Sequence, residues 1–216
     1  MFQHNPVLER WEFDSAMTMS TTVLPDGCRD VIGRLEPGGR TTWWLTDWVD
    51  TAYTVHGQPG QTWVGYRLQP GVCLRENELR RQIALLGDAP LNTDLRNLLA
   101  DHTRLDDDVI SALQALAQVD RVASAARALG VSERTLLRTL QRQTGKVPSY
   151  WLQLARARRA ARDLQTDTPL ADLAARHGYA DQAHLSRSMR QWFGYSPLQL
   201  RQAPNYLSGM VLDGYC

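Results

Sequence analysis

Residues 178–194, GYADQAHLSRSMRQWFG, decide how the carboxyl-terminal half of the chain is built. A glycine-aromatic pair and Asp181 come first, and Leu185, Met189 and Phe193 then follow at helical spacing. Glycine tolerates the positive φ angle of a sharp turn, and an Asp side chain accepts a hydrogen bond from an unpaired backbone N–H at a helix start. The stretch therefore predicts a tight turn and a helix that buries one face and leaves the other free.

The same arrangement occurs earlier in the chain, so that residues 120–148 and 168–197 form an internal repeat. Before the turn the copies align at an offset of 48 residues, through Val122 with Leu170, Ala126 with Ala174 and Gly130 with Gly178. After the turn they align at an offset of 49, through Ser132, Leu136, Arg138, Leu140, Gly145 and Pro148 with Asp181, Leu185, Arg187, Met189, Gly194 and Pro197. This match predicts one supersecondary unit used twice, with one extra residue in the second turn.

Each copy has the parts of a helix-turn-helix unit: a small residue where the helices cross, a glycine that ends the first helix, and Ser132 or Asp181 as the cap of the second. The free face carries Glu133, Arg134, Leu137, Arg138 and Gln141 in the first copy, and Gln182, Ala183, Ser186, Arg187 and Arg190 in the second. Such a helix fits the major groove of DNA, where Arg pairs with guanine and Gln with adenine. The alternative is a plain helical bundle with a basic surface, and two matched copies favour the first interpretation.

A third helix is predicted between the copies, from Pro148 over about eighteen residues or ~27 Å. A rod of that length suits two helices in successive major grooves, which lie ~34 Å apart. Its apolar seam consists of Tyr150, Leu154, Ala157, Ala161 and Leu164, with Trp151 as a further candidate. Its four arginines, Arg156, Arg158, Arg159 and Arg162, are expected to face solvent or form ion pairs rather than read bases.

The composition is that of an intracellular globular protein, because 43% of the 216 residues are hydrophobic and 22% are charged. No apolar run approaches the ~20 residues that cross a bilayer, and the first residues lack the pattern of a secretion signal. The three cysteines include no CxxC pair and the five histidines no HxxxH or HExxH motif, so we expect no disulfide framework, metal or cofactor. These features together predict a cytoplasmic location.

Charge divides the chain into two unlike halves. Residues 1–104 carry ten Arg and thirteen Asp or Glu, a net charge of 10 − 13 = −3. Residues 119–203 carry fourteen Arg or Lys and six acids, a net charge of 14 − 6 = +8. The basic half predicts a polyanionic partner, although a solvated basic face is the simpler alternative. We find no nucleophile–base pair, phosphate loop or paired carboxylates at meaningful spacing, which argues against an enzyme.

The first seventy residues predict a small antiparallel sheet or partial barrel, because β-branched and aromatic residues cluster between Gly and Pro turns. The predicted strands are residues 20–24, 30–36, 41–48, 51–57 and 62–69, and helical spacing follows in 76–87 and 91–102. The acidic residues 106–108 then open another helix, because negative charge suits a helix start. We therefore predict an α+β chain with a β-rich domain and trailing helices over 1–104. An all-α domain over 105–203 then holds helix-turn-helix units at about 120–145 and 169–194, and 204–216 is a tail.

The carboxyl-terminal half resembles the DNA-binding domain of AraC-type transcription regulators over about residues 108–203. GVSERTLLRTLQRQTGKVPSYW resembles the first helix-turn-helix of that family, and LADLAARHGYADQAHLSRSMRQWFGYSPLQLR resembles the second. The resemblance implies a seven-helix domain, a role as a transcription factor, and the base-reading residues Arg134, Thr135, Arg138, Gln182, Ser186 and Arg187. Leu137 stands where the family often has a polar residue, so contact with a thymine methyl and partial burial are both open. Ala183 is shorter than a usual base-reading residue.

Phosphate contacts are predicted for residues near the ends of these helices, namely Arg142, Lys146, His184 and Arg190. For Arg142, Lys146 and Arg190, a merely solvated position is an equal alternative. His184 matches a histidine frequent in the family, for which a structural or phosphate-contact role is favoured over base reading.

The amino-terminal half resembles the shortened sensor domains of one AraC-type subgroup, through VLPDGCRDVIG and VGYRLQPGVCL. Such domains sense a small molecule or mediate dimerisation. The implied partners are thus double-stranded DNA, a small-molecule effector, a second copy in a homodimer and, for an activator, RNA polymerase. Trp43, Trp44, Trp63 and Tyr66 are candidates for an apolar ligand pocket, with a simple β core as the alternative. Competing functions are a small-molecule-binding protein or enzyme with an accessory helical domain, and an adaptor whose repeated units no longer read bases.

Overall fold

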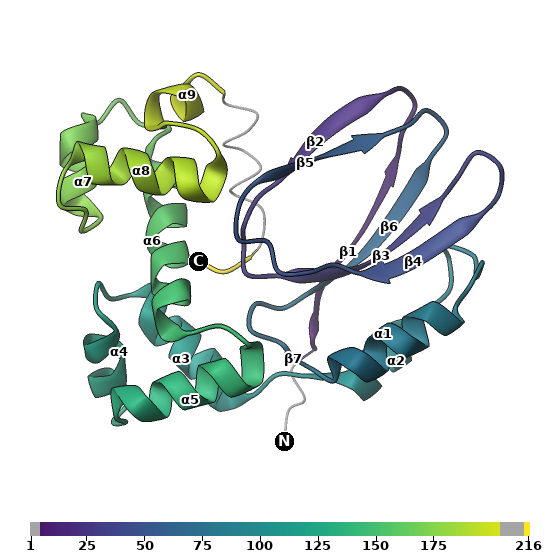
Figure 1. The fold of residues 1–216 in the computed structure, drawn as a ribbon, viewed down its shortest axis with the longest axis horizontal. Coiled ribbons are helices and arrows are strands. Elements are labelled where there is room, and N and C mark those ends of the chain that lie inside the picture. Colours follow the sequence, from purple (N-terminus) through teal and green to yellow (C-terminus); the bar gives the residue numbers. More distant parts are fainter. Residues whose placement is uncertain (1–4, 204–213) are drawn as a thin grey trace. The chain divides into compact units, whose positions relative to one another are not determined.

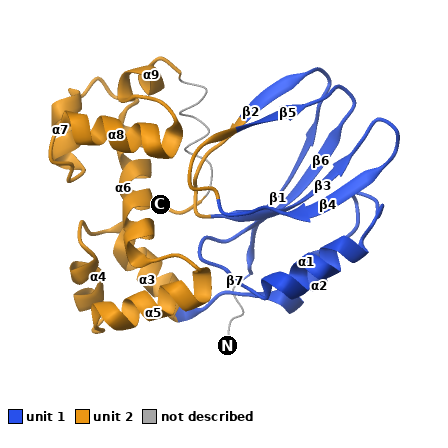
Figure 2. Ribbon diagram, viewed as in Figure 1, with its two compact units in different colours: residues 1–21, 28–48, 54–107 blue, residues 22–27, 49–53, 108–216 orange. Residues whose placement is uncertain are grey.

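The computed structural model describes residues 5–203 and 214–216, and the chain divides into two compact units (Figure 2). The sheet unit comprises residues 1–21, 28–48 and 54–107, and the helical unit comprises residues 22–27, 49–53 and 108–216. Two short segments of the amino-terminal half therefore belong to the helical unit. The predicted fold class, a β-rich part followed by an all-α part, is confirmed. Most of the predicted tail, residues 204–213, lies outside the described residues.

The sheet unit is built on four antiparallel strands in the order β1-β6-β3-β4 (Figure 1). Their bounds are Val7–Asp14 (β1), Arg29–Leu35 (β3), Thr41–Leu45 (β4) and Thr62–Leu68 (β6). A second pair joins β2 (Met19–Val23) to β5 (Tyr53–Gly57), and a third joins β7 (Cys73–Leu74) to β8 (Thr103–Arg104). The predicted strands form, but β2 and β5 pair with each other outside the four-stranded sheet. β1, β7 and β8 were not predicted.

One face of the four-stranded sheet is covered by α1 (Glu76–Leu85) and α2 (Arg96–His102), as Figure 1 shows. Alternate strand residues point to this face and form a core with the helices. Its buried residues are Val31, Trp43, Leu45, Val64, Tyr66, Leu68, Val72, Leu79, Ile83, Leu95 and Leu99. α2 begins later than predicted, because the Thr93 N–H bonds to the Pro90 carbonyl at 2.9 Å and Asp94 accepts from the Arg96 N–H at 3.0 Å. These bonds hold the preceding residues in turns.

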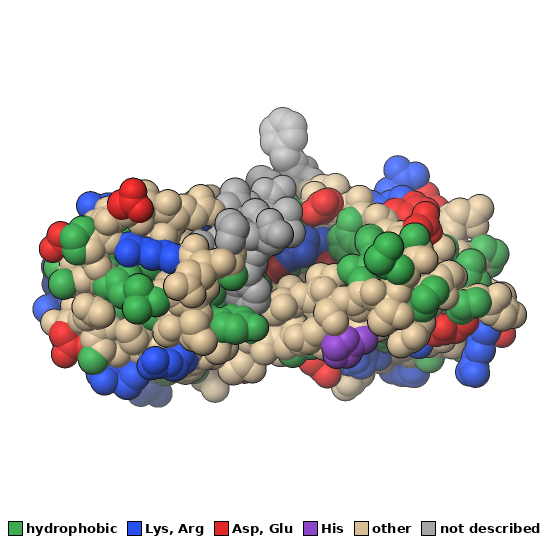
Figure 3. Space-filling model, turned by 90° about the horizontal axis from the view of Figure 1, so that it is seen from above, with side chains coloured by type: hydrophobic (Ala, Val, Ile, Leu, Met, Phe, Trp, Pro, Cys, Tyr) green, Lys and Arg blue, Asp and Glu red, His purple; other side chains and the backbone are tan. Residues whose placement is uncertain are grey.

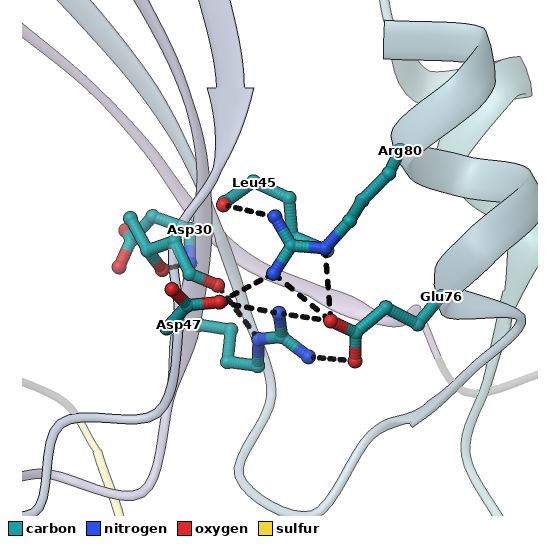
Figure 4. A network of polar contacts seen from close by, with 7 residues as sticks. Asp30, Leu45, Asp47, Glu76 and Arg80 are labelled. Carbon is teal, nitrogen blue, oxygen red and sulfur yellow. Dashed lines mark hydrogen bonds and ion pairs between the residues drawn. The ribbon is translucent and has the colours of Figure 1, made fainter.

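A network of charged side chains holds the first turn of α1 against the strands (Figure 4). Arg29 is buried, with 2% of its side chain exposed, and donates to Glu76 at 2.7 and 3.2 Å and to the Thr46 carbonyl at 2.8 Å. Arg80 donates to Glu76 at 2.9 Å and also pairs with Asp47. The hydrogen bonds to Glu76, those from Arg29 foremost, lower its pKa from 4.5 to about 2.

Gly65 allows β1 to lie close against β6. Trp11 faces Gly65 across the pair of strands, and a Cβ at Gly65 would lie 2.0 Å from the Trp11 indole. That indole donates to the Asp30 carboxylate at 3.1 Å, and burial raises the pKa of Asp30 from 3.8 to about 6. Glycine is thus required here by close packing rather than by its backbone angles.

The carboxyl-terminal half of the described chain contains seven successive helices. They are α3 (Asp107–Ala117), α4 (Val122–Ala128), α5 (Glu133–Thr144), α6 (Pro148–Asp163), α7 (Leu170–Arg176), α8 (Gln182–Phe193) and α9 (Pro197–Arg201). α6 has 16 residues, fewer than predicted. Its end tightens into i→i+3 hydrogen bonds from the Gln165 and Thr166 N–H groups, which stops the helix there.

α6 forms the centre of the helical unit. Figure 1 shows α5 and α8 packed near its opposite ends, and each helix runs across it in this view. The predicted seam is confirmed for Trp151, Leu154, Ala157, Ala161 and Leu164, which are at most 1% exposed, whereas Tyr150 is half-buried. The small alanines allow close contact with the neighbouring helices, so α6 serves as a spacer between the two copies.

Two arginines of α6 donate hydrogen bonds to backbone carbonyls of other segments. Arg158 is 1% exposed, and its guanidinium donates to the Pro25 carbonyl at 3.2 Å. Arg156 donates to the Asp120 carbonyl at 2.9 Å and lies over the Tyr179 ring at 5.7 Å. Arg158 therefore does not face solvent, because segment 22–27 covers it from far away in the sequence.

The described end of the chain also packs into the helical unit. Tyr215 is 5% exposed, its hydroxyl donates to the Leu113 carbonyl at 2.9 Å, and its ring contacts Trp151 edge to face at 5.1 Å. Its backbone N–H donates to the Asp26 carbonyl at 2.8 Å. Tyr215 therefore connects α3, α6 and segment 22–27.

Candidate nucleic-acid interface

The first predicted reading helix, α5, is bounded by local signals at both ends. Gly130, with φ of 67°, ends the preceding α4, and the Ser132 hydroxyl accepts a hydrogen bond from the Thr135 N–H at 3.1 Å. Gly145, with φ of 74°, ends α5 itself. Leu136 and Leu140 are buried. The predicted turn, cap and inward face of the first copy are confirmed.

The second reading helix, α8, is formed in the same way. Gly178, with φ of 70°, ends α7, and the Asp181 carboxylate accepts from the His184 N–H at 2.6 Å. Gly194, with φ of 77°, ends α8. The inward residues Leu185, Met189 and Phe193 are fully buried. The opening stretch of the sequence is thus a turn and an amphipathic helix, as predicted.

The two copies match at the level of single hydrogen bonds. α4 and α7 begin 48 residues apart, and α5 and α8 begin 49 apart. In the first turn the Val131 N–H bonds to the Ala126 carbonyl at 3.0 Å, and in the second the Tyr179 N–H bonds to the Ala174 carbonyl at 2.8 Å. The extra residue, Ala180, comes directly after this shared turn. The predicted insertion is therefore confirmed and lies just before the second helix cap.

The residue after the turn glycine makes the two copies unequal. Val131 is 38% exposed, whereas Tyr179 is 6% exposed. The Tyr179 hydroxyl lies 3.1 Å from the Ser188 hydroxyl, and its ring meets His184 edge to face at 5.2 Å. Tyr179 thus anchors the second turn to α8, a contact that valine cannot make in the first copy.

The predicted base-reading residues lie on the outer faces of α5 and α8. Arg134, Thr135, Arg138, Gln182 and Arg187 are exposed, and Ser186 is half-buried. The three arginines form no ion pair with residues of the described chain. The Thr135 hydroxyl lies 2.9 Å from that of Ser132, so it also takes part in the helix cap. Leu137 is exposed at 38%, and Ala183 is exposed as well.

The four predicted phosphate-contact residues have different surroundings. Arg142 and Arg190 are exposed in the last turns of α5 and α8. The Nδ1 atom of His184 accepts from the Ala180 N–H at 3.3 Å, so His184 helps to shape the second turn. Lys146 forms an ion pair with Asp50, with Nζ 2.8 Å from both carboxylate oxygens. In the view of Figure 3, basic side chains of the helical unit lie in several separate groups with hydrophobic side chains between them.

The four aromatic residues predicted to line a ligand pocket do not form one cluster. Trp43 and Tyr66 belong to the core beneath α1 and α2, where they donate to the carbonyls of Ala89 at 2.9 Å and Thr93 at 3.0 Å. Trp44 and Trp63 point to the other face of the sheet, because neighbouring strand residues alternate. Their rings meet edge to face at 5.9 Å, and the Arg34 guanidinium lies 5.8 and 5.1 Å from them.

Two contacts of this region were not predicted from the sequence. Trp192 is 4% exposed and packs against Tyr150 at 5.5 Å, which joins α8 to α6. The apolar pair that Trp192 forms with Phe193 in the sequence is the feature that could have indicated this burial. Asp50 is 96 residues from Lys146 in the sequence, and no local pattern links the two.

Neither a metal site nor a membrane span is found in the part of the chain that the structure describes. No group of three His, Cys, Asp or Glu within residues 5–203 and 214–216 is placed to hold a metal ion. No helix in the same residues is long and apolar enough to cross a membrane.

The geometry defines a protein with two helix-turn-helix units joined by a spacer helix. A family profile described as "Helix-turn-helix domain" matches residues 125–203. The "HTH-type transcriptional activator RhaS" of Escherichia fergusonii is 34% identical over 132 residues, which are 61% of this chain and 42% of that protein. Residues 125–203 are therefore a helix-turn-helix domain of the AraC type, and the family resemblance of the sequence is confirmed. The chain spans less than half the length of this RhaS.

Two solved structures match the chain with TM-scores below 0.5. The C-terminal domain of AraT, a response regulator from Geobacillus stearothermophilus, is 29% identical, with 46% of this chain and 88% of that chain covered and a TM-score of 0.43. ToxT from Vibrio cholerae O395 is 11% identical, with 93% of this chain and 97% of that chain covered and a TM-score of 0.45.

Proposed function

We propose that this chain is a sequence-specific transcriptional regulator that reads two successive major grooves of double-stranded DNA with α5 and α8. The observation that carries the proposal is a matched pair of exposed arginines. Arg138 and Arg187 occupy equivalent positions of two helices with equivalent caps, and neither is paired with a carboxylate of the described chain. An unpaired guanidinium on an exposed helix face can donate two hydrogen bonds to guanine.

The spacer supports this proposal by its length and by the places at which α5 and α8 pack on it. The 16 residues of α6 correspond to ~24 Å, which is of the order needed for grooves ~34 Å apart. α5 and α8 lie near opposite ends of α6 in Figure 1, as two helices that enter successive grooves must do. The remaining predicted readers, Arg134, Thr135, Gln182 and Ser186, lie on the same two helices.

We also propose that the sheet unit controls DNA binding, through a small-molecule effector or through self-association in a homodimer. Of the predicted ligand residues, Trp44 and Trp63 remain candidates, because they share one sheet face with Arg34. Curated relatives named as activators make RNA polymerase a further partner in this proposal. We propose no enzymatic activity for the chain, and DNA reading agrees with the predicted cytoplasmic location.

The test begins with selection of bound fragments from a genomic library, followed by titration of the enriched site with the full chain. Arg138→Ala and Arg187→Ala should each weaken binding by ~1–3 kcal/mol, or roughly 5- to 150-fold, because each removes a base contact. The matched control is Arg81→Ala, an exposed arginine on α1 of the sheet unit. A variant that carries both Arg138→Ala and Arg187→Ala should lose both base contacts. If it kept the affinity and sequence preference of the wild type, base reading would be refuted and an adaptor favoured.

A second candidate, a small-molecule-binding protein or enzyme with an accessory helical domain, makes a different prediction. Such a protein would bind its ligand normally after both arginines are replaced and would select no DNA sequence. Selection of a defined site by the wild-type chain therefore separates the two.

A further inference from the structure

Lys146 is the only lysine in a chain with 24 Lys and Arg residues. It follows the glycine that ends α5 and precedes α6, and its backbone N–H bonds to the Thr144 hydroxyl at 3.1 Å. Its Nζ atom lies 2.8 Å from both carboxylate oxygens of Asp50 and 4.7 Å from the centroid of the Tyr150 ring. A cation predicted to contact phosphate is thus already bound to an anion.

The segment Val49–Tyr53, which carries Asp50, contacts both copies of the repeat. Asp50 pairs with Lys146, two residues after α5, and the Ala52 N–H donates to the Trp192 carbonyl in the last turn of α8 at 3.1 Å. Carbonyls in the last turn of a helix lack partners within the helix, so this bond satisfies one of them. Trp192 in turn packs on Tyr150, whose ring lies under Lys146. The segment therefore closes a chain of contacts between α5, α6 and α8.

We propose that segment Val49–Tyr53 is an inhibitory brace, in which Asp50 holds Lys146 in place of a DNA phosphate. This inference rests on the proposed DNA-binding function. A phosphate that approaches Lys146 competes with Asp50 for the hydrogen bonds that the ammonium donates. The negative charge of the Asp50 carboxylate also repels the phosphate. Release of Asp50 removes this competing carboxylate from Lys146. The Lys146 side chain is 19% exposed and that of Asp50 58%, so the pair is accessible enough to exchange partners with DNA.

The position of the brace in the chain makes it a means of control. Residues 46–52 connect β4 to β5 and include Asp50, so a change in either strand acts on Asp50 through the covalent chain. An effector bound to the sheet unit thereby regulates a residue of the helical unit without entering the DNA interface.

The test compares Asp50→Asn with the wild-type chain in titrations of the selected DNA site at several salt concentrations. D50N keeps the shape of the side chain and removes its charge. We expect about two- to fivefold tighter binding, as for loss of a competing exposed ion pair. The plot of log K against log salt should be steeper by about 0.9, because one more phosphate is neutralised. Asp50→Ala should behave in the same way, and circular dichroism checks that both variants fold.

Two further variants isolate the pair. In a Lys146→Gln background D50N should have no effect, because the cation that Asp50 masks is gone. Asp167→Asn is the charge control. Asp167 is exposed between α6 and α7 and forms no ion pair with the described residues. Loss of its charge should therefore change DNA binding less than D50N does.

A readout without DNA uses the single lysine. Acylation of Lys146 by acetic anhydride, followed by mass spectrometry, should be several-fold faster in D50N than in the wild type. The brace is overturned if D50N and the wild type are acylated at equal rates, or if the two bind the selected DNA with equal affinity and equal salt slope. Either result leaves the proposed function standing. Failure of both the wild type and D50N to select any DNA overturns the proposed function, whatever the acylation rates.

Discussion

Replacement of Glu76 with Gln should destabilise the sheet unit by about 2 kcal/mol at neutral pH. The pKa of Glu76 is lowered from 4.5 to about 2, which converts to ~3 kcal/mol at 1.36 kcal/mol per unit. Because 43% of the Glu76 side chain is exposed, solvent screening reduces this to ~1–2 kcal/mol. The 2% exposed Arg29 would lose its partner at 2.7 Å, and an unpaired buried cation adds to the cost.

Urea unfolding followed by tryptophan fluorescence measures this effect, because five of the seven tryptophans lie in the sheet unit. The matched control is Glu78→Gln on the same helix. Its side chain is 50% exposed and pairs with Arg75 at 3.6 Å, so the change should cost less than ~0.5 kcal/mol.

The pH dependence gives an independent check of the same reasoning. The folded-state pKa of Glu76 lies below its unfolded value, so its contribution is present above pH 4.5 and is lost as the pH falls toward about 2. The difference in the free energy of unfolding between the wild type and Glu76→Gln should shrink over that window. Equal stabilities at neutral pH, or a difference that stays constant down to about pH 2, would refute the argument.

Three further predictions concern single residues. Asp181→Ala should lower the stability of the helical unit by ~1 kcal/mol through loss of the α8 cap, and an unchanged thermal melt of the helical circular dichroism signal would contradict this. Gly65→Ala should cost at least ~1–3 kcal/mol in urea unfolding because its Cβ meets Trp11, whereas Gly38→Ala, with open space, should cost little; equal effects would disprove the close contact. Arg142→Gln should reduce the slope of log K against log salt by ~0.9 without changing sequence preference, and altered preference would assign Arg142 to base reading.

The helix-turn-helix copies were predictable because their signals are local. Gly130 and Gly178 supply the backbone angle of the turn, and Ser132 and Asp181 cap the helix that follows. Each of these effects acts over a few residues, so the sequence carries it without knowledge of the rest of the fold. Helical spacing likewise predicted the burial of Leu185, Met189 and Phe193 in α8, although not that of Trp192.

The surroundings of charged and aromatic side chains were predictable only in part. The exposed positions of Arg138 and Arg187 follow from helical periodicity, whereas the burial of Arg158 depends on the distant segment 22–27. Trp43 and Trp44 are adjacent, so strand alternation separates them onto opposite faces. The sequence alone left both a shared ligand pocket and a simple β core open for these residues.

The sequence by itself determined the class of fold, the repeat, the helix caps and the inward faces, because backbone preference and periodicity operate between near neighbours. Tertiary structure alone decided that Arg29 is neutralised by Glu76 and that Lys146 is held by Asp50, pairs that are 47 and 96 residues apart. A charge has no preferred partner along the chain. Which acid meets which base is set when packing brings distant segments within hydrogen-bonding distance.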